Sequence, residues 1–428
     1  MSVREDRQVS SALAQSAVHG VTWFGISQVL GQVVRLVAMV VLARLLLPEE
    51  FGIVAMATVV TDFALTAGDL GLSEAIVQRK RITQAHLSAS FWAGLVLGII
   101  LCLITVAVSP LVANFFGEAQ VGPVLALSAV CFVIAPLRTV HSALLRKRLQ
   151  FFRFTVAEIA QTVAYVATAV PLAFAGFGVW SLVIGNLAGH LALATLRWVL
   201  CRWRPSATFS IKSLKDLWGF GLNVTGSRIV QLLIQRLDYL IVGRFLTPAA
   251  LGFYNLGHRT TGFLTNGVRM TIGRVAFPTF SIVQDEDERL RRGFARSVSY
   301  LSLVTIPLFV GLAIVAPELV PLVFGKAWTP AVLPVQVLCA MAAIRSISVT
   351  IEPVLRAKGR PDIELKLSLA NVALLVPGLL LGVRFGTVGV ALAVAVVALV
   401  IWLTRQVFVN RVICLLYTSD AADEGLGV

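Results

Sequence analysis

The amino-acid sequence predicts an all-α polytopic membrane protein built from two parallel six-helix bundles. Three observations predict it: the apolar composition, the alternation of apolar segments with basic loops, and an internal repeat. Of 428 residues, 57% are hydrophobic and only 14% are charged, and the mean hydropathy is +0.87. Because roughly a quarter of the residues of a soluble domain are charged, this composition excludes water-soluble enzymes and disordered chains.

Apolar segments long enough to cross a bilayer recur along the chain, since one transmembrane helix needs about 20 residues. The pattern predicts about twelve such helices. They cover residues 17–45, 52–77, 86–113, 121–144, 155–175, 179–201, 216–243, 250–283, 295–320, 330–355, 363–383 and 388–410.

The predicted helices fall into two groups of six. We expect a cytoplasmic N-terminal tail at residues 1–16 and a first lobe over residues 17–201. A cytoplasmic linker over residues 202–215 leads into a second lobe over residues 216–413.

The basic residues indicate the orientation of the helices. Most of the 36 Lys and Arg residues lie in the even-numbered loops and at both ends. The odd-numbered loops hold only Arg44, Arg244, Lys326 and Arg384. Because Lys and Arg are enriched in cytoplasmic loops, both ends are expected to be cytoplasmic. The net charge of +14 is scattered between apolar segments, so we expect no nucleic-acid partner.

An internal repeat relates the two halves. Residues 43–52 align with residues 243–252, each with Arg, Pro and Gly at the second, sixth and tenth positions. Further pairs follow in the same order: Phe116-Gly117 with Phe324-Gly325, Leu145-Arg146 with Leu355-Arg356, and Phe177-Gly178 with Phe385-Gly386. Because six helices return the chain to the same side, the halves are predicted to be parallel repeats.

Polar stripes run along the first two helices of each half. An ionisable side chain at mid-bilayer costs about 2.5–3.5 kcal/mol on insertion scales, so each should face a cavity or a partner. The stripes predict a cationic, water-filled cleft between the halves, suited to an anionic substrate because guanidinium groups bind phosphate through paired hydrogen bonds. The predicted substrate-binding residues are Arg35, Arg228, Arg236, Arg259, Arg269, Gln28, Gln32, Gln235, Asn255 and Asn266.

The acidic residues of the same stripes allow two interpretations. Asp62, Asp69 and Asp238 either couple transport to an ion or neutralise arginines across the interface. Arg138, Glu74 and Glu158 lie on other faces or near helix ends, and we interpret them as structural pairs.

The sequence has no motif typical of catalysis. It lacks the phosphate-binding loop G-x-x-x-x-G-K-[ST], the zinc motif H-E-x-x-H and the nucleophile motif G-x-S-x-G. We therefore expect no catalytic residues, no metal and no cofactor, and interpret the chain as a transporter rather than an enzyme.

Particular motifs resemble one family. The run Leu-Ala-Arg-Leu-Leu-Leu-Pro-Glu-Glu-Phe-Gly at residues 42–52, followed by residues 69–72 and 78–80, resembles the opening of bacterial polysaccharide flippases. These belong to the multidrug/oligosaccharidyl-lipid/polysaccharide exporter superfamily. Residues 316–328 and 359–362 resemble the second half of that group. The chain is most similar to the branch that moves O-antigen, exopolysaccharide or teichuronic-acid repeat units.

The resemblance implies two six-helix lobes around a central cavity that opens alternately to either side, as in multidrug exporters of the superfamily. It implies an oligosaccharide substrate linked by pyrophosphate to undecaprenol, translocated across the bacterial inner (plasma) membrane. It also implies that Arg35, Arg228, Arg259 and Arg269 hold the pyrophosphate. The implied partners are this lipid-linked substrate, membrane lipids, a polysaccharide polymerase and glycosyltransferases.

Three alternatives stay open. A lipid II flippase of the same superfamily would share the fold and the anionic substrate. A cation-coupled drug exporter fits less well, because its cleft would favour acidic residues. From a different class, a polytopic glycosyltransferase or polymerase should show a large external loop with acidic or arginine-rich motifs, which this sequence lacks.

The end of the chain departs from the family pattern. Members often have fourteen helices, so twelve indicate a truncated chain. Residues 414–428 can be back-translated into the transposase adapter used in sequencing libraries. We expect this segment to be sequencing-adapter read-through with no fold of its own.

Overall fold

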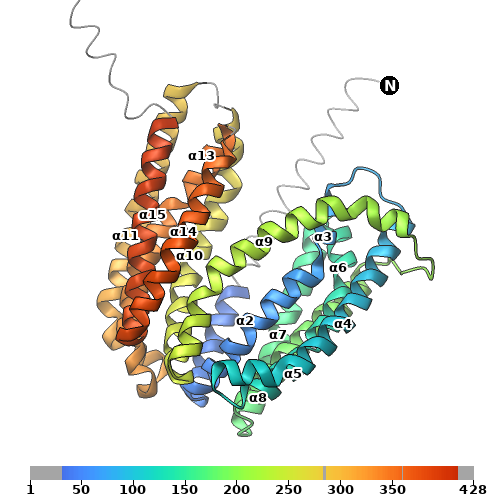
Figure 1. The fold of residues 1–428 in the computed structure, drawn as a ribbon, viewed down its shortest axis with the longest axis horizontal. Helices are drawn as coiled ribbons and strands as arrows, with labels where there is room; N and C mark the ends of the chain where they lie inside the picture. Colours follow the sequence, from blue (N-terminus) through green and yellow to red (C-terminus); the bar gives the residue numbers. More distant parts are fainter. Residues whose placement is uncertain (1–30, 283–285, 359, 413–428) are drawn as a thin grey trace, which may run out of the picture. The chain divides into compact units, whose positions relative to one another are not determined.

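The computed structural model describes residues 31–282, 286–358 and 360–412, apart from a few side chains within these ranges. Every regular element in them is a helix (Figure 1). Eight helical stretches in these ranges are long and apolar enough to cross a membrane. The predicted all-α, multi-pass membrane fold is therefore confirmed. The chain divides into two units, Met1–Arg244 and Phe245–Val428, each described by itself.

The N-terminal unit begins, as far as it is described, with a helix over residues 31–45. The following helices are α2 (Pro48–Asp69), α3 (Leu72–Gln78), α4 (Gln84–Phe116), α5 (Val121–Ser128), α6 (Cys131–Lys147), α7 (Phe151–Phe174), α8 (Val179–Leu200) and α9 (Ile211–Phe245).

The C-terminal unit contains the helices after α9. They are α10 (Pro248–Ile282), α11 (Asp287–Phe324), η1 (Lys326–Ala331), α12 (Val332–Ile347), η2 (Ser348–Thr350), α13 (Ile351–Ala357), α14 (Pro361–Gly382), η3 (Val383–Phe385) and α15 (Gly386–Val412).

The repeated sequence motifs lie at equivalent places in the two units. Pro48 and Pro248 begin α2 and α10, where the fixed φ of proline suits the first turn of a helix. Gly117 and Gly325 follow the last residues of α4 and α11 with φ of 72° and 103°. Since a side chain is strained at positive φ, glycine is favoured where each helix must stop.

Three of the predicted spans are interrupted. The span expected over residues 52–77 breaks at Leu70 and Gly71, whose φ values are 47° and 61°. The spans expected over residues 121–144 and 330–355 are each divided into shorter helices.

The count of twelve spans stays a prediction. The eight candidate stretches do not include α9 or α10, which carry several of the predicted cavity arginines. The predicted tail at residues 1–16, the beginning of the first helix and residues 414–428 lie outside the described residues.

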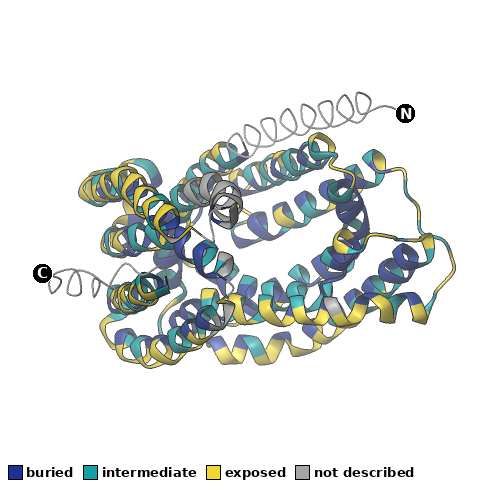
Figure 2. Ribbon diagram, turned by 90° about the horizontal axis from the view of Figure 1, so that it is seen from above, coloured by how far each residue is buried: buried dark blue, intermediate teal, exposed yellow. Residues whose placement is uncertain are grey.

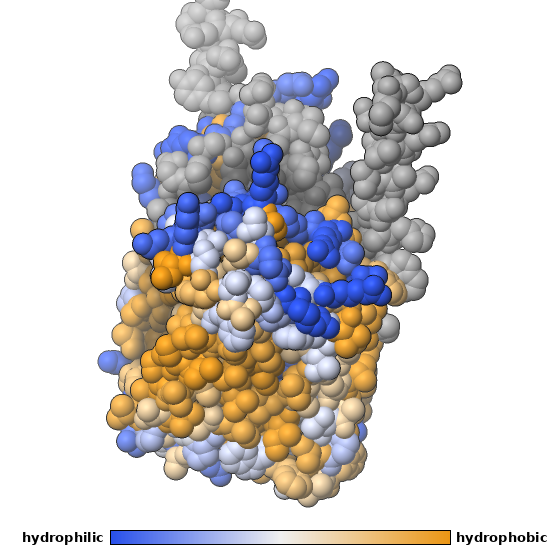
Figure 3. Space-filling model, turned by 90° about the vertical axis from the view of Figure 1, so that its right-hand side faces the viewer, coloured by the Kyte–Doolittle hydropathy of each residue, from blue (hydrophilic) through white to orange (hydrophobic). Residues whose placement is uncertain are grey.

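The helices bury one side and leave the other exposed (Figure 2), and many of the exposed residues are large and apolar. Figure 3 shows a face of the N-terminal unit as a broad hydrophobic band, with hydrophilic side chains gathered at one end. On α4, for example, Val96 and Leu103 are 57% and 66% exposed. Exposed apolar residues in such a band match the hydrocarbon region of a bilayer.

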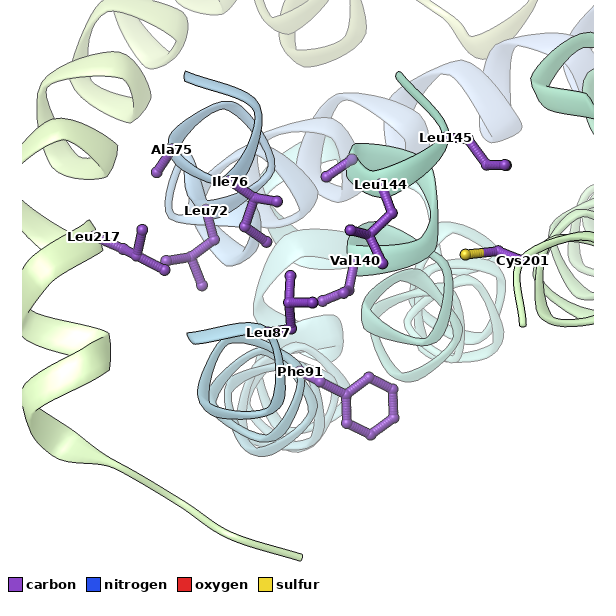
Figure 4. Close-up of a cluster of buried hydrophobic side chains, with 11 residues drawn as sticks. Leu72, Ala75, Ile76, Leu87, Phe91, Val140, Leu144, Leu145, Cys201 and Leu217 are labelled. Atoms are coloured by element: carbon purple, nitrogen blue, oxygen red, sulfur yellow. The ribbon is translucent and has the colours of Figure 1, made fainter. Parts of the chain in front are cut away.

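A buried hydrophobic cluster joins helices of the N-terminal unit at the end that carries the basic loops (Figure 4). Its members come from α3, α4, α6, the end of α8 and α9. They are Leu72, Ala75, Ile76, Leu87, Phe91, Val140, Ala143, Leu144, Leu145, Cys201 and Leu217.

Helix α9 belongs to the N-terminal unit as far as Arg244, whereas the sequence pattern predicts that residues 216–243 belong to the second lobe. Leu217 belongs to the cluster of Figure 4. Arg79, which follows α3, donates to the Asp216 carboxylate at 3.1 Å. Gly221 lies directly against Gly71, with no room for a side chain at either position.

Because of this close approach, we expect one added methyl group to lower the stability of the protein at Gly221 but not at Gly219. A Cβ on Gly221 would overlap the carbonyl oxygen of Leu70, whereas a Cβ on Gly219 would meet nothing within 4 Å. We expect Gly221→Ala to lower stability by about 1–3 kcal/mol through overpacking. Gly219→Ala should leave it unchanged or raise it by up to about 1 kcal/mol through helix propensity. Thermal unfolding of the two purified variants in the same detergent checks this, and equal melting temperatures would contradict it.

Candidate functional site

A polar cavity of about 560 Å³ lies within the N-terminal unit. Residues of α2, α3, α4, α6, α7, α8 and α9 line it. Its ionisable lining residues are Asp69, Glu74, Arg138, Arg146, Glu158, Arg197 and Arg228. Four arginines thus face three carboxyl groups, which leaves positive charge in excess.

The break between α2 and α3 positions two carboxylates of this cavity, those of Asp69 and Glu74. Because Leu70 and Gly71 both adopt left-handed backbone conformations, the chain turns between Asp69 at the end of α2 and Glu74 in α3. Arg228 of α9 reaches both carboxylates, at 3.2 Å from Asp69 and 2.7 Å from Glu74. Glu74 also lies 3.6 Å from Arg146 of α6. These four side chains form one compensated cluster.

Arg197 of α8 forms a second compensated group. Its guanidinium contacts Glu158 of α7 at 2.7 Å and donates to the Ser142 hydroxyl at 2.5 Å. It also lies over the Phe154 ring, 4.7 Å from the centroid. Arg197 is only 2% exposed, so this charge is held inside the unit by its partners.

Arg138 of α6 differs from the other three arginines. It lies one helical turn before Ser142 and two turns before Arg146, so the three side chains share one face of α6. The Nε of Arg138 is buried without a partner, as are those of Arg146 and Arg197, but its guanidinium alone among the four makes no hydrogen bond or ion pair with the residues that the structure describes, although Glu158 and Asp69 are close enough to interact with its charge. A buried charged donor without a partner is unfavourable, so an anion in the cavity would be stabilised at this position.

Three of the residues singled out from the sequence come together here: Asp69, Arg228 and Gln235 all line the cavity. Asp62 and Arg236 instead form their own ion pair at 2.6 Å, and Arg236 lies over the Tyr239 ring, 5.1 Å from the centroid. Asp62 and Asp69 therefore each have an arginine partner in this structure.

The other predicted site residues lie elsewhere. Gln32 and the exposed Arg35 lie in the helix over residues 31–45, and the buried Asp238 accepts the backbone N–H of Tyr239 at 2.9 Å. In the C-terminal unit, Arg259 donates to the Asn255 side chain at 3.3 Å. None of these described residues lines the cavity. Gln28 and the side chains of Asn266 and Arg269 lie outside the described residues.

Sequence reasoning missed part of the cavity. Arg138, Glu74 and Glu158 were predicted to be structural pairs on other faces or near helix ends, and Arg146 and Arg197 were not among the predicted site residues. The available signal was the spacing of Arg138, Ser142 and Arg146 at intervals of four residues, which places them on one helix face.

Known proteins with similar sequences are involved in the biosynthesis of polysaccharides. The family model described as "Polysaccharide biosynthesis protein" matches residues 41–333. The chain is 29% identical to the lipopolysaccharide biosynthesis protein WzxC of Escherichia coli K12, over 91% of this chain and 80% of that protein. It is 29% identical to the teichuronic acid biosynthesis protein TuaB of Bacillus subtilis 168, over 82% of this chain and 73% of that protein.

Among solved structures, the lipid II flippase MurJ in an inward closed conformation is similar, with a TM-score of 0.76. The match covers 91% of this chain and 87% of that one at 16% sequence identity. At this identity the likeness concerns the fold alone.

Proposed function

Because the chain belongs to the polysaccharide biosynthesis protein family, we propose that it is a flippase for surface polysaccharide assembly. It translocates undecaprenyl-pyrophosphate-linked oligosaccharide repeat units across the bacterial inner membrane by alternating access. The observation that carries the proposal is the cavity with excess arginine inside a membrane-embedded unit. Its support is the match to proteins named for the biosynthesis of two different surface polysaccharides.

The cavity suits the charged part of such a substrate. A pyrophosphate diester carries its negative charge on phosphate oxygens, and guanidinium groups bind these through paired hydrogen bonds. Arg138 can bind without breaking a hydrogen bond or an ion pair, because its guanidinium makes neither with the described residues. Arg228 is shared between two carboxylates, so an anion there competes with Asp69 and Glu74. We therefore propose that the pyrophosphate first contacts Arg138. It then contacts Arg228, where it replaces the carboxylates of Asp69 and Glu74.

Residues outside the cavity would contribute the rest of the proposed path. Arg35 and Arg236 of the N-terminal unit and Arg259 and Arg269 of the C-terminal unit would bind the pyrophosphate as the lobes alternate. Gln28, Gln32, Gln235, Asn255 and Asn266 would hydrogen-bond the glycan. Asp62, Asp69 and Asp238 would neutralise arginines or couple an ion.

The proposed orientation has both ends in the cytoplasm. It is supported by the basic residues Arg79, Lys80, Arg81, Arg202 and Arg204, which lie in the loops at one end of the N-terminal unit. Glycosyltransferases would then supply the lipid-linked substrate on the side of these loops, and a polymerase would consume it on the other side.

Deletion of the gene in its host tests the function. We expect surface polysaccharide to fall to background and lipid-linked repeat units to accumulate in the cytoplasmic leaflet, with both effects reversed by a plasmid copy. A normal transmembrane distribution of the repeat units would contradict the proposal. Rescue of a strain depleted of its lipid II flippase would favour the lipid II alternative. Drug sensitivity with normal polysaccharide would favour an exporter.

A further inference from the structure

An apolar groove of about 620 Å³ opens on the N-terminal unit beside the polar cavity. It lies between α4, the segment that joins α8 to α9, and the beginning of α9. All of its lining residues are apolar. The principal ones are Leu70, Trp92, Val96, Ile100, Phe209 and Trp218.

The joining segment is held firmly against α4. The Trp92 indole N–H donates to the Ser206 carbonyl at 2.8 Å, and the Ser206 N–H donates to the Ser88 hydroxyl at 3.0 Å. The Gln84 side chain donates to the Arg204 carbonyl at 2.8 Å. Because the indole N–H of Trp92 is already satisfied, Trp92 presents its apolar ring to the groove.

The groove and the cavity adjoin where α2 meets α4. Asp69 lines the cavity, and the next residue, Leu70, lines the groove. On α4, Leu101 lines the cavity and Ile100 lines the groove. Leu70 has a φ of 47°, which is uncommon for a residue other than glycine, asparagine or aspartate. Successive residues, Asp69 and Leu70, thus line the arginine-lined cavity and the apolar groove.

The depth of the groove indicates what occupies it. Trp92 lies eight residues into α4, which is about 12 Å along the helix at 1.5 Å per residue. Val96 and Ile100 lie farther along α4, a helix long and apolar enough to cross a membrane, and both are exposed. At this depth an occupant is surrounded by hydrocarbon and must itself be apolar. The arginine-lined cavity begins at the residues next to the groove, Asp69 and Leu101, and this nearness favours an apolar chain that carries an anionic group at one end.

We propose that the groove holds the polyprenyl chain of the lipid-linked substrate while its pyrophosphate lies in the adjoining cavity. This inference rests on the proposed flippase function and adds a second, apolar half to the binding site. Chain and headgroup are then recognised separately: the groove selects for a long isoprenoid, and the arginines select for pyrophosphate. An ordinary phospholipid would fill the groove without placing a pyrophosphate beside Arg138.

Filling the groove tests the inference. Val96→Trp adds bulk to the groove, and Leu103→Trp is the control on the same helix, exposed to a similar degree (66% against 57%) but outside the groove. Each full-length protein is purified into phosphatidylcholine nanodiscs and titrated with undecaprenyl pyrophosphate and with inorganic pyrophosphate. Val96→Trp should weaken undecaprenyl pyrophosphate binding at least tenfold and change inorganic pyrophosphate binding less than twofold. Leu103→Trp should change neither.

A second variant removes contact instead of adding bulk. Phe209→Ala shortens one wall of the groove, and it should also weaken binding of undecaprenyl pyrophosphate alone. Unchanged binding in both groove variants would overturn the inference and assign the groove to ordinary phospholipid. Equal losses for both ligands would also overturn it, because the substitutions would then act on the cavity. If the parent protein bound neither ligand, the proposed function itself would fail.

Discussion

Replacing Arg197 with alanine is expected to destabilise the protein by about 3 kcal/mol, the lower end of the range for breaking a buried ion pair, because Arg197 is buried while its partner Glu158 is half-buried. Arg197 is 2% exposed and contacts Glu158 at 2.7 Å. The substitution also removes the donor to Ser142 and the cation over the Phe154 ring. Thermal unfolding of the purified protein in detergent measures the loss as a lower melting temperature.

Two further variants test whether the loss of stability depends on the burial of Arg197 or only on the loss of an ion pair. Arg289 and Glu286 form an exposed ion pair at 2.9 Å, and Arg289→Ala should cost at most about 1 kcal/mol. Replacing both members of the buried pair, as Arg197→Met with Glu158→Met, should recover most of the lost stability, because no lone charge remains. If Arg197→Ala melted at the same temperature as Arg289→Ala, the buried pair would not have the structural role assigned to it.

Replacing Arg138 with glutamine is expected to reduce translocation at least tenfold, which corresponds to about 1.4 kcal/mol of lost interaction, while the melting temperature stays the same or rises. Arg138 has no hydrogen bond or ion pair with the described residues, so its removal breaks no contact of that kind. Loss of activity without loss of stability is typical of a residue kept for function. The rate of translocation in reconstituted vesicles and the melting temperature together check this expectation.

The matched control is Arg228, an arginine of the same cavity that has partners. Arg228→Gln leaves Asp69 and Glu74 without their closest cation, so both stability and translocation should fall. An Arg138→Gln protein that translocates at the normal rate would remove Arg138 from the proposed site. A parallel fall in melting temperature would instead make Arg138 a structural residue.

Much of the fold could be predicted from the sequence because membrane helices are long and apolar. The spans expected at residues 155–175 and 179–201 appear as α7 and α8, separated at Gly178 with a φ of 55°. The break between α2 and α3 was not predicted. It depends on left-handed backbone at Leu70, a residue whose own preference is helical.

The candidate site could be predicted only in part. Asp69, Arg228 and Gln235 lie on helices with a clear polar stripe, so periodicity was enough to select them. Glu158 and Arg197 are 39 residues apart in the sequence, and their pairing depends on how α7 packs against α8. The lack of a partner for Arg138 is likewise a property of the packed helices. No pattern within one helix distinguishes it from a paired arginine.

Translocation in vesicles tests the central claim most directly. Purified protein is reconstituted into vesicles that contain the lipid-linked oligosaccharide in both leaflets, and a glycan-cleaving enzyme is added outside. The proposed function predicts that the oligosaccharide of the inner leaflet becomes accessible with time, faster with the parent protein than with Arg138→Gln. An inner-leaflet fraction that stays protected, as in protein-free vesicles, while the protein remains folded would contradict it.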